Sequence, residues 1–229
     1  MKLDNRLKAV AAMVPPGKTI ADIGTDHAYL PVCLLQKGLI KAAIAGDLKC
    51  GPCQAAQRTV REAALFEYIQ IRQGDGLQVV APGEAEVLII AGMGGSSIAG
   101  ILSARPKITA AFERIIVQPM TGAALVRQYF RQNGWQIVAE DLVADETKIY
   151  QIIAAEKGLP SEFDVILDEI GELNWQNRHP LLKNLLLKEM THLKNVAASL
   201  AKSKSERNIS KYRQYCQMIE KMEEKLLCL

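Results

Sequence analysis

The stretch ADIGTDHAYLP, residues 21–31, decides the fold of this chain. The run KTIADIG (18–24), which overlaps its start, has the composition of a β-strand that ends in a glycine turn, and AYLPVCLLQKG (28–38) is typical of a helix that ends at its last glycine. A strand that turns at a glycine directly into a helix opens a nucleotide-binding βαβ unit. Gly24 allows the tight turn and lets the backbone approach a ligand closely. On this stretch alone, a structural βα turn without a ligand is the open alternative.

Short β-rich runs and helical patterns alternate outward from this unit to about residue 155. The run EVLIIAG (86–92) is apolar throughout, as expected for a central strand covered on both faces. WQIVAEDLVAD and KIYQIIAAE predict a closing antiparallel pair. The alternation predicts an α/β fold with a seven-stranded, mostly parallel sheet and right-handed crossovers. The other predicted strands are 18–24, 42–47, 68–72 and 114–119, and the other predicted helices are 52–64, 96–104 and 121–134.

A different pattern begins after a predicted linker at 156–175. Apolar residues recur at steps of three or four in 182–200 and again in 209–226, and the polar run SKSERN lies between them. We expect a helical hairpin that forms a short antiparallel coiled coil. The predicted domains are 1–158, which carries the sheet, and 159–229, which is helical. Because a helical hairpin can close on itself or on a second copy, the sequence leaves the oligomeric state open.

The composition of the 229 residues excludes several classes of protein. No apolar run approaches the roughly 18 residues of a membrane span, and the N-terminus lacks the apolar core and cleavage site of a signal peptide. We therefore expect a cytoplasmic protein without a membrane partner. Five cysteines form an odd set without the spacing of a disulfide framework. No metal site is expected, because there is one CxxC pair and the three histidines lie far from it in sequence.

The net charge of +3 hides an asymmetry along the chain. Residues 178–229 hold 11 Lys and Arg against 5 Asp and Glu, whereas residues 1–177 hold 17 against 20. A basic segment beside a nearly neutral body favours a polyanion as the partner of that segment. The alternative is a pair of Lys-rich helices that is merely well solvated, and charge alone does not decide between the two.

Acidic or glycine-rich residues follow each of the first four predicted strands. The dinucleotide motif GxGxxG is absent after the first strand, and Asp22 and Asp26 would repel a pyrophosphate but suit a ligand with a sulfonium and an α-amino group. Asp47 can accept hydrogen bonds from both ribose hydroxyls, and Asp75 can accept one from an adenine amino group. The small residues around Met93 in AGMGG leave room for the ligand and an incoming base. Together these residues predict one nucleotide site at the carboxyl ends of the strands.

The sequence CGPC (50–53) is the redox signature of thioredoxin-like proteins. Here it follows the second strand of a complete nucleotide-site βαβ unit, and no thioredoxin-like order of elements comes after it. We interpret Cys50 and Cys53 as the start of a helix with Pro52 in its first turn. Dithiol catalysis is the less favoured alternative, although a helix N-terminus lowers the pKa of a thiol and would allow adventitious reactivity.

The set DIGTDHAYLP, AGD followed by GP, RQGDGL, IIAGMGG and VQP resembles the bacterial tRNA (adenine-N1)-methyltransferases that modify adenosine 22 in the D-loop. The resemblance covers essentially the whole chain. It implies a Rossmann-like domain that uses S-adenosylmethionine, a C-terminal coiled coil and tRNA as the substrate. The family often has an asparagine where this chain has Met120, so an amide there is not essential unless Gln118 or Asn133 replaces it. The cofactor residues that the resemblance implies are Asp22, Gly24 and His27 on the methionine side, Asp47 at the ribose, Asp75 and Gly76 at the adenine, and Gly92, Met93 and Gly94 at the transfer point.

Two side chains are candidates for the chemistry of methyl transfer. N1 of adenine has a free lone pair, so no base need activate it, but the target base must be flipped out to expose its Watson–Crick edge. Asp26 is the first candidate, because a carboxylate would stabilise the cationic product or take a proton from N6. Tyr29 is the second, as a stacking platform or a polar guide. The alternatives are that Asp26 caps a helix starting at His27, that Tyr29 belongs to the core, and that His27 is a hydrogen-bonded turn residue.

Contacts with tRNA phosphates are expected from basic side chains. No aromatic-interleaved platform for single strands is visible, which favours recognition of shape and backbone. Two rival classes stay open: a small-molecule methyltransferase that dimerises through the coiled coil and acts without RNA, and a non-catalytic RNA-binding protein. The candidate RNA-binding residues are Arg6, Arg178, Lys183, Lys202, Lys204 and Arg207.

Overall fold

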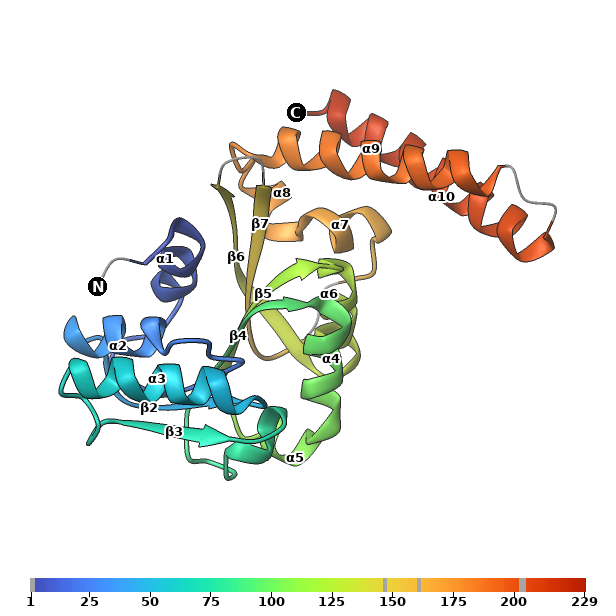
Figure 1. Ribbon diagram of the computed structural model, residues 1–229. Helices are drawn as coiled ribbons and strands as arrows, with labels where there is room; N and C mark the ends of the chain where they lie inside the picture. Colours follow the sequence, from blue (N-terminus) through green and yellow to red (C-terminus); the bar gives the residue numbers. More distant parts are fainter. Residues whose placement is uncertain (1–2, 146–147, 160–161, 202–204) are drawn as a thin grey trace. The chain divides into compact units, whose positions relative to one another are not determined.

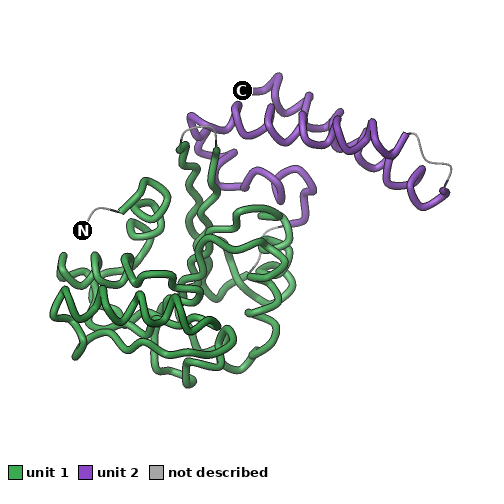
Figure 2. Tube along the Cα trace, viewed as in Figure 1, with its two compact units in different colours: residues 1–161 green, residues 162–229 purple. Residues whose placement is uncertain are grey.

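The computed structural model describes residues 3–145, 148–159, 162–201 and 205–229. The chain forms two compact units, Met1–Ser161 and Glu162–Leu229 (Figure 2). The first unit holds the β-sheet with its flanking helices, and the described part of the second unit is helical.

The first unit is built on a seven-stranded sheet with the order β3-β2-β1-β4-β5-β7-β6 (Figure 1). β1 to β5 are parallel to one another, and β7 pairs antiparallel with both β5 and β6. The order 3-2-1-4-5 is that of doubly wound nucleotide-binding folds, whose switch point lies between β1 and β4. The predicted α/β class and the antiparallel closing hairpin are therefore confirmed. The strands are β1 (Lys18–Ile23), β2 (Ile40–Asp47), β3 (Ile69–Gln73), β4 (Val87–Gly94), β5 (Arg114–Thr121), β6 (Trp135–Asp145) and β7 (Lys148–Lys157).

Helices cover both faces of this sheet (Figure 1). One face is covered by α1, α2 and α3, and the other by α4 and α6. α3 begins at Cys50, so the prediction that CGPC starts a helix is confirmed. The helices are α1 (Asn5–Ala12), α2 (Tyr29–Gln36), α3 (Cys50–Glu62), η1 (Gly76–Val79), α4 (Gly95–Ala104), α5 (Pro106–Thr109) and α6 (Ala123–Gln132).

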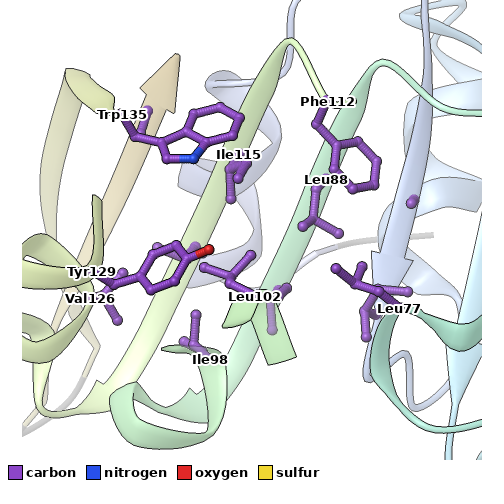
Figure 3. Close-up of a cluster of buried hydrophobic side chains, with 14 of the residues drawn as sticks. Leu77, Leu88, Ile98, Leu102, Phe112, Ile115, Val126, Tyr129 and Trp135 are labelled. Carbon is purple, nitrogen blue, oxygen red and sulfur yellow. The ribbon is translucent and has the colours of Figure 1, made fainter. Parts of the chain in front are cut away.

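Two hydrophobic clusters lie on the two faces of the sheet, and alternate residues of each central strand enter them in turn. Residues 87–90 of β4 are fully buried, which confirms that this strand is central. Leu88 and Ile90 join the cluster under α4 and α6, part of which Figure 3 shows, whereas Val87 and Ile89 join the other. Burial of each such side chain contributes about 1.5–3 kcal/mol. This core fixes the carboxyl ends of the strands.

A buried ion pair ties α6 to the β6–β7 hairpin. The side chains of Arg127 and Glu140 are 2% and 0% exposed, and Arg127 Nε donates to Glu140 Oε1 over 2.7 Å. Arg127 Nη2 also donates to Gln151 Oε1 over 2.8 Å. Charges of this kind are tolerated in a protein interior only when they are paired and hydrogen-bonded. The pair therefore holds the hairpin in one position on α6.

The second unit contains α7 (Val165–Ile170), α8 (Glu172–Gln176), α9 (Leu182–Leu200) and α10 (Glu206–Leu227). α7 and most of α8 lie within the predicted linker at 156–175, so part of that segment is helical. Asp164 starts α7 by accepting hydrogen bonds from two backbone N–H groups, those of Ile166 and Leu167. A side-chain cap of this kind stabilises even a short helix by about 1 kcal/mol.

α9 and α10 pack against each other, so the predicted helical hairpin is confirmed. The apolar stripe of α9 is buried at Leu182, Leu186, Met190 and Ala197, whereas in α10 only Met222 of the predicted stripe is buried. Lys194 and Glu223 form an exposed ion pair between the helices, with Nζ and Oε1 2.9 Å apart. The coiled-coil geometry stays a prediction. Among the described residues, no helix combines the length and the apolar composition that a membrane crossing would need.

Candidate active site

A cavity of about 340 Å³ lies at the carboxyl ends of β1 and β4, where the strand order of the sheet reverses. This is the place where doubly wound sheets bind their ligands. Its wall comes from β1, the turn that follows it and the start of α2, from α1 with the residue that caps it, and from the end of β4. The lining residues are Asp4, Arg6, Leu7, Asp22, Gly24, Thr25, Asp26, His27, Ala28, Tyr29, Leu30, Ala91 and Gly92.

The turn after β1 uses its own amide groups to hold the next strand. Gly24 has a φ of +82°, a conformation that favours glycine. The N–H groups of Gly24 and Thr25 both donate to the carbonyl oxygen of Gly46, over 2.8 and 3.1 Å. Two amides that could otherwise bind an anion are therefore already occupied. This arrangement, like the acids nearby, disfavours a pyrophosphate at the turn.

Asp22 sits beneath this turn and is 7% exposed. Burial raises the pKa of its carboxyl to about 6, and a hydrogen bond with the Thr25 side chain partly opposes the shift. Loss of hydration penalises the charged form of a buried acid. A nearby cation opposes this effect, because it favours the ionised form of the carboxyl. Asp22 is therefore suited to a positively charged ligand in the cavity.

Asp26, His27 and Tyr29 form the open rim of the cavity. The side chain of Asp26 is 77% exposed, and its Oδ2 lies 3.4 Å from Nε2 of His27. The rings of His27 and Tyr29 are stacked, with centroids 4.9 Å apart and an angle of 9° between their planes. α2 begins at Tyr29, and the N–H of Ala28 donates to the Thr25 hydroxyl. Asp26 is therefore not the helix cap, and Tyr29, which is 42% exposed, is not a core residue.

The end of β4 forms the opposite wall. Gly92 has a φ of +80° and interrupts the pairing of β4 with β5. Its N–H donates instead to Oε1 of Gln118, over 3.1 Å. Met93 follows and reaches across to Gly24, and Gly94 is the residue before α4. The predicted transfer-point residues therefore gather beside the β1 turn, although Met93 and Gly94 do not line the cavity itself.

A second cavity of about 260 Å³ lies between the turn after β3 and α4. Asp75 and Gly76 line it together with the apolar side chains of Leu77 and Ile101. An exposed carboxylate beside apolar side chains suits the amino edge and the faces of an adenine ring. Asp47 lines neither cavity, and its Oδ1 accepts from the N–H of Lys49 over 2.8 Å at the end of β2.

Gln118 is the functional candidate that the strand-end reasoning did not place. It is fully buried at the end of β5, and its Oε1 accepts from Arg6 Nη1 over 2.8 Å as well as from Gly92. The signal that could have found it is Met120, which stands where the family often has asparagine. Gln118 is one of the two amides that could replace that asparagine. The other, Asn133, donates to the Tyr129 carbonyl at the end of α6.

The two cysteines of CGPC differ in environment. Cys50 is exposed at the start of α3. Cys53 is buried, and burial raises the pKa of its thiol, which donates to the Asp47 carbonyl over 3.5 Å. A raised thiol pKa lowers the fraction of thiolate, and this opposes dithiol chemistry at this position.

The candidate RNA-binding residues lie in both units. Arg178, Lys183 and Arg207 are exposed in the second unit. Lys202 and Lys204 lie outside the described residues. Arg6 is not on an open basic surface, because its guanidinium forms part of the cavity wall. Within the described chain, no three His, Cys, Asp or Glu side chains are grouped as a metal site would need.

Comparisons with known proteins point in one direction. Residues 3–153 match a family model described as a methyltransferase domain. The tRNA (adenine(22)-N(1))-methyltransferase of Bacillus subtilis (strain 168) is 40% identical over 158 residues, which are 69% of this chain and 66% of that protein. The crystal structure of the B. subtilis m1A22 tRNA methyltransferase TrmK is 31% identical, with a TM-score of 0.90 over 98% of this chain and 99% of that chain.

A second solved structure adds a ligand. It is that of an inferred tRNA (m1A22) methyltransferase from Streptococcus pneumoniae in complex with S-adenosyl-L-methionine. It is 32% identical to this chain, with a TM-score of 0.88 over 98% of this chain and 100% of the other.

Proposed function

The chain belongs to the family of tRNA (adenine(22)-N(1))-methyltransferases, and we propose that it transfers a methyl group from S-adenosylmethionine to N1 of adenosine 22 in the D-loop of tRNA. The observation that carries this proposal is the cavity between β1 and β4, which combines buried and exposed carboxylates with an exposed aromatic face. Such a wall suits a cationic donor and a cationic product.

S-adenosylmethionine supplies an electrophilic methyl group next to a sulfonium and an α-amino group. Asp22 is the buried acid that matches these positive charges, and the close turn at Gly24 leaves room for the donor. Asp75 accepts from the adenine amino group in the second cavity, with Gly76 beneath the ring. Asp47 holds the ribose hydroxyls from the end of β2. His27 and the segment from Gly92 to Gly94 complete the cofactor residues.

The target base enters from the open rim. Its N1 is on the Watson–Crick edge, so the adenosine must be unpaired and flipped. Tyr29 offers an exposed face for stacking, and the parallel ring of His27 supports it from behind. Asp26 places a carboxylate at the same rim, where it stabilises the positive charge that methylation creates on the ring and accepts the acidified N6 proton.

The helical part of the chain contributes binding to tRNA. We assign residues 1–158 to the catalytic domain and 159–229 to the tRNA-binding domain. The support is the excess of basic residues after residue 178 and the exposure of Arg178, Lys183 and Arg207. Lys202 and Lys204 are assigned the same role on charge alone. A tRNA substrate also implies that the protein works in the cytoplasm.

The test is transfer of a labelled methyl group to bulk tRNA that lacks the modification, followed by nucleoside mapping. We expect label in 1-methyladenosine at position 22 and no transfer without RNA. Transfer to a small molecule in the absence of RNA would favour the rival small-molecule enzyme. Binding of tRNA and S-adenosylmethionine without any turnover would favour the non-catalytic rival.

A further inference from the structure

One positive side chain is built into a cavity wall that is otherwise acidic. Asp4, Asp22 and Asp26 contribute carboxylates, and Arg6 is the one Lys or Arg among the described residues that line this cavity. The side chain of Arg6 is 20% exposed, so it belongs to the wall rather than to an open surface. Its guanidinium lies 5.9 Å from the ring centroid of Tyr150 on β7.

The side-chain amide of Gln118, which is buried and distant in the sequence, holds Arg6 in place. Gln118 lies 112 residues away, is 0% exposed, and accepts the bond from Arg6 on its Oε1. The same oxygen accepts from Gly92, and Nε2 donates to the Pro119 carbonyl over 3.0 Å. Bonds on both ends of the amide fix its orientation. Gln118 therefore sets the position of the Arg6 guanidinium and of the β4 bulge together.

The donor that the proposed function requires carries one group that the acids cannot bind. Its methionine end has an α-carboxylate besides the sulfonium and the α-amino group. The first two amides of the β1 turn, at Gly24 and Thr25, are already donating to Gly46. A guanidinium in a partly buried wall is the strongest available partner for a carboxylate. Arg6 meets this description in the described cavity wall.

We propose that Arg6 binds the α-carboxylate of S-adenosylmethionine and that Gln118 is the residue that positions Arg6 for it. This inference rests on the proposed function and replaces the RNA contact expected of Arg6 from its charge. Arg6 Nη2 also lies 3.5 Å from Oδ2 of Asp4, and in the proposed role the guanidinium meets the one negative charge of the methionine end while Asp22 faces the positive groups. The proposed role also assigns a purpose to the amide at 118 in a chain that has Met120 where its family often has asparagine.

The test compares two ligands by calorimetry: S-adenosylmethionine and its decarboxylated analogue, which keeps the sulfonium and the amine. Arg6→Ala is expected to weaken binding of S-adenosylmethionine about 10- to 100-fold, the range for a lost bond to a charged group. It should leave the affinity for the analogue within about twofold. Arg6→Lys keeps the charge and should show an intermediate loss. Thermal melts of each variant report folding.

Gln118 is tested by the ratio of the two affinities. Gln118→Met removes both acceptor bonds and should lower the preference for S-adenosylmethionine over the analogue. Gln118→Glu keeps an acceptor for Arg6 but neutralises its charge, so it should lower the same preference. A purely structural role of Gln118 would weaken both ligands equally and leave the ratio unchanged.

Three results would overturn the inference. Equal losses for both ligands in Arg6→Ala or Arg6→Lys would make Arg6 structural. An unchanged affinity for S-adenosylmethionine with weaker tRNA binding would make Arg6 a phosphate contact. Unchanged affinity for both would place the carboxylate elsewhere, such as at the start of α2. If the parent protein binds neither ligand, the proposed function itself fails, and this outcome is distinct from the other three.

Discussion

Gly24 and Met93 approach each other so closely that a Cβ atom on Gly24 would overlap the terminal methyl carbon of Met93. The first residue follows β1 and the second lies at the end of β4, so the contact joins the two strand ends that frame the cavity. A side chain at position 24 would push Met93 out of its place. The absence of a Cβ is therefore a requirement of the site as well as of the turn.

Gly24→Ala is expected to destabilise the protein and weaken S-adenosylmethionine binding. The φ of +82° costs a residue with a Cβ about 1–2 kcal/mol, and Met93 must also move. Gly51→Ala in α3 is the matched control, since a Cβ there meets nothing within 4 Å. Urea unfolding and calorimetry measure the two effects. The double variant Gly24→Ala/Met93→Ala should recover only the part of the lost stability that is due to overlap with Met93. Full recovery would show that the backbone conformation carries no cost.

Asp22→Asn should stabilise the protein in a pH-dependent way. The folded-state pKa of about 6 lies above 3.8, the ordinary pKa of an aspartate carboxyl, so the folded state binds this proton more tightly than the unfolded state. Stability is therefore lost as the pH rises from about 4 through 6, by up to about 3 kcal/mol for a shift of this size. The amide avoids that loss.

The measurement is urea unfolding without ligand at pH 4 and pH 8. The variant should exceed the parent at pH 8, and the difference should vanish near pH 4. Asp26→Asn is the control, because it makes the same substitution at a side chain that is 77% exposed instead of buried. Asp22→Asn should also bind S-adenosylmethionine more weakly at pH 8, since it cannot carry a negative charge. An advantage that is equal at both pH values would contradict the buried-charge explanation.

The strands could be predicted within a few residues because each is a β-rich run between turn residues, and the central ones are short and apolar, as in 86–92. The site residues that directly follow the parallel strands could also be predicted, because the carboxyl ends of parallel strands share one edge of the sheet. α7 and α8 could not, because helices of six and five residues are too short to show a period. The bond from Arg6 to Gln118 also leaves no local signal, because it joins residues 112 positions apart.

Arg127→Met should be among the most destabilising substitutions in the first unit. It breaks the buried ion pair with Glu140 by removing the guanidinium, which costs about 3–5 kcal/mol. Lys194→Met is the matched control, because its pair with Glu223 is exposed and should contribute no more than about 1 kcal/mol. Chemical denaturation measures both. Arg127→Met/Glu140→Leu should recover most of the loss. If the single variant unfolds at the parent's midpoint, the ion pair does not hold the hairpin.

The cysteines of CGPC should differ in reactivity and be dispensable for methyl transfer. Iodoacetamide at pH 7.5, followed by mass spectrometry of peptides, should label Cys50 well before Cys53, because burial raises the pKa of the Cys53 thiol. Cys50→Ser/Cys53→Ser should keep methyl transfer within a few-fold of the parent. The parent should not reduce insulin. Dithiol turnover that disappears in the double variant would restore the redox interpretation.

The basic residues of the second unit should control the salt dependence of tRNA binding. Each phosphate that a Lys or Arg neutralises releases counterions, so the affinity falls linearly on a logarithmic scale with added salt. Arg178→Glu, Lys183→Glu and Arg207→Glu should each weaken binding and reduce that slope by about 1. S-adenosylmethionine affinity should not change, because these residues line neither described cavity of the first unit.

Lys107→Glu on α5 is the control for each single variant. Its charge change is the same, but α5 precedes β5 and so lies at the amino end of that strand. Filter binding at several salt concentrations measures the slope. A triple variant combines Arg178→Glu, Lys183→Glu and Arg207→Glu. If the salt dependence of its tRNA affinity equals that of the parent and of the control, the helices of the second unit do not contact phosphates, and their positive charge serves solubility or another partner.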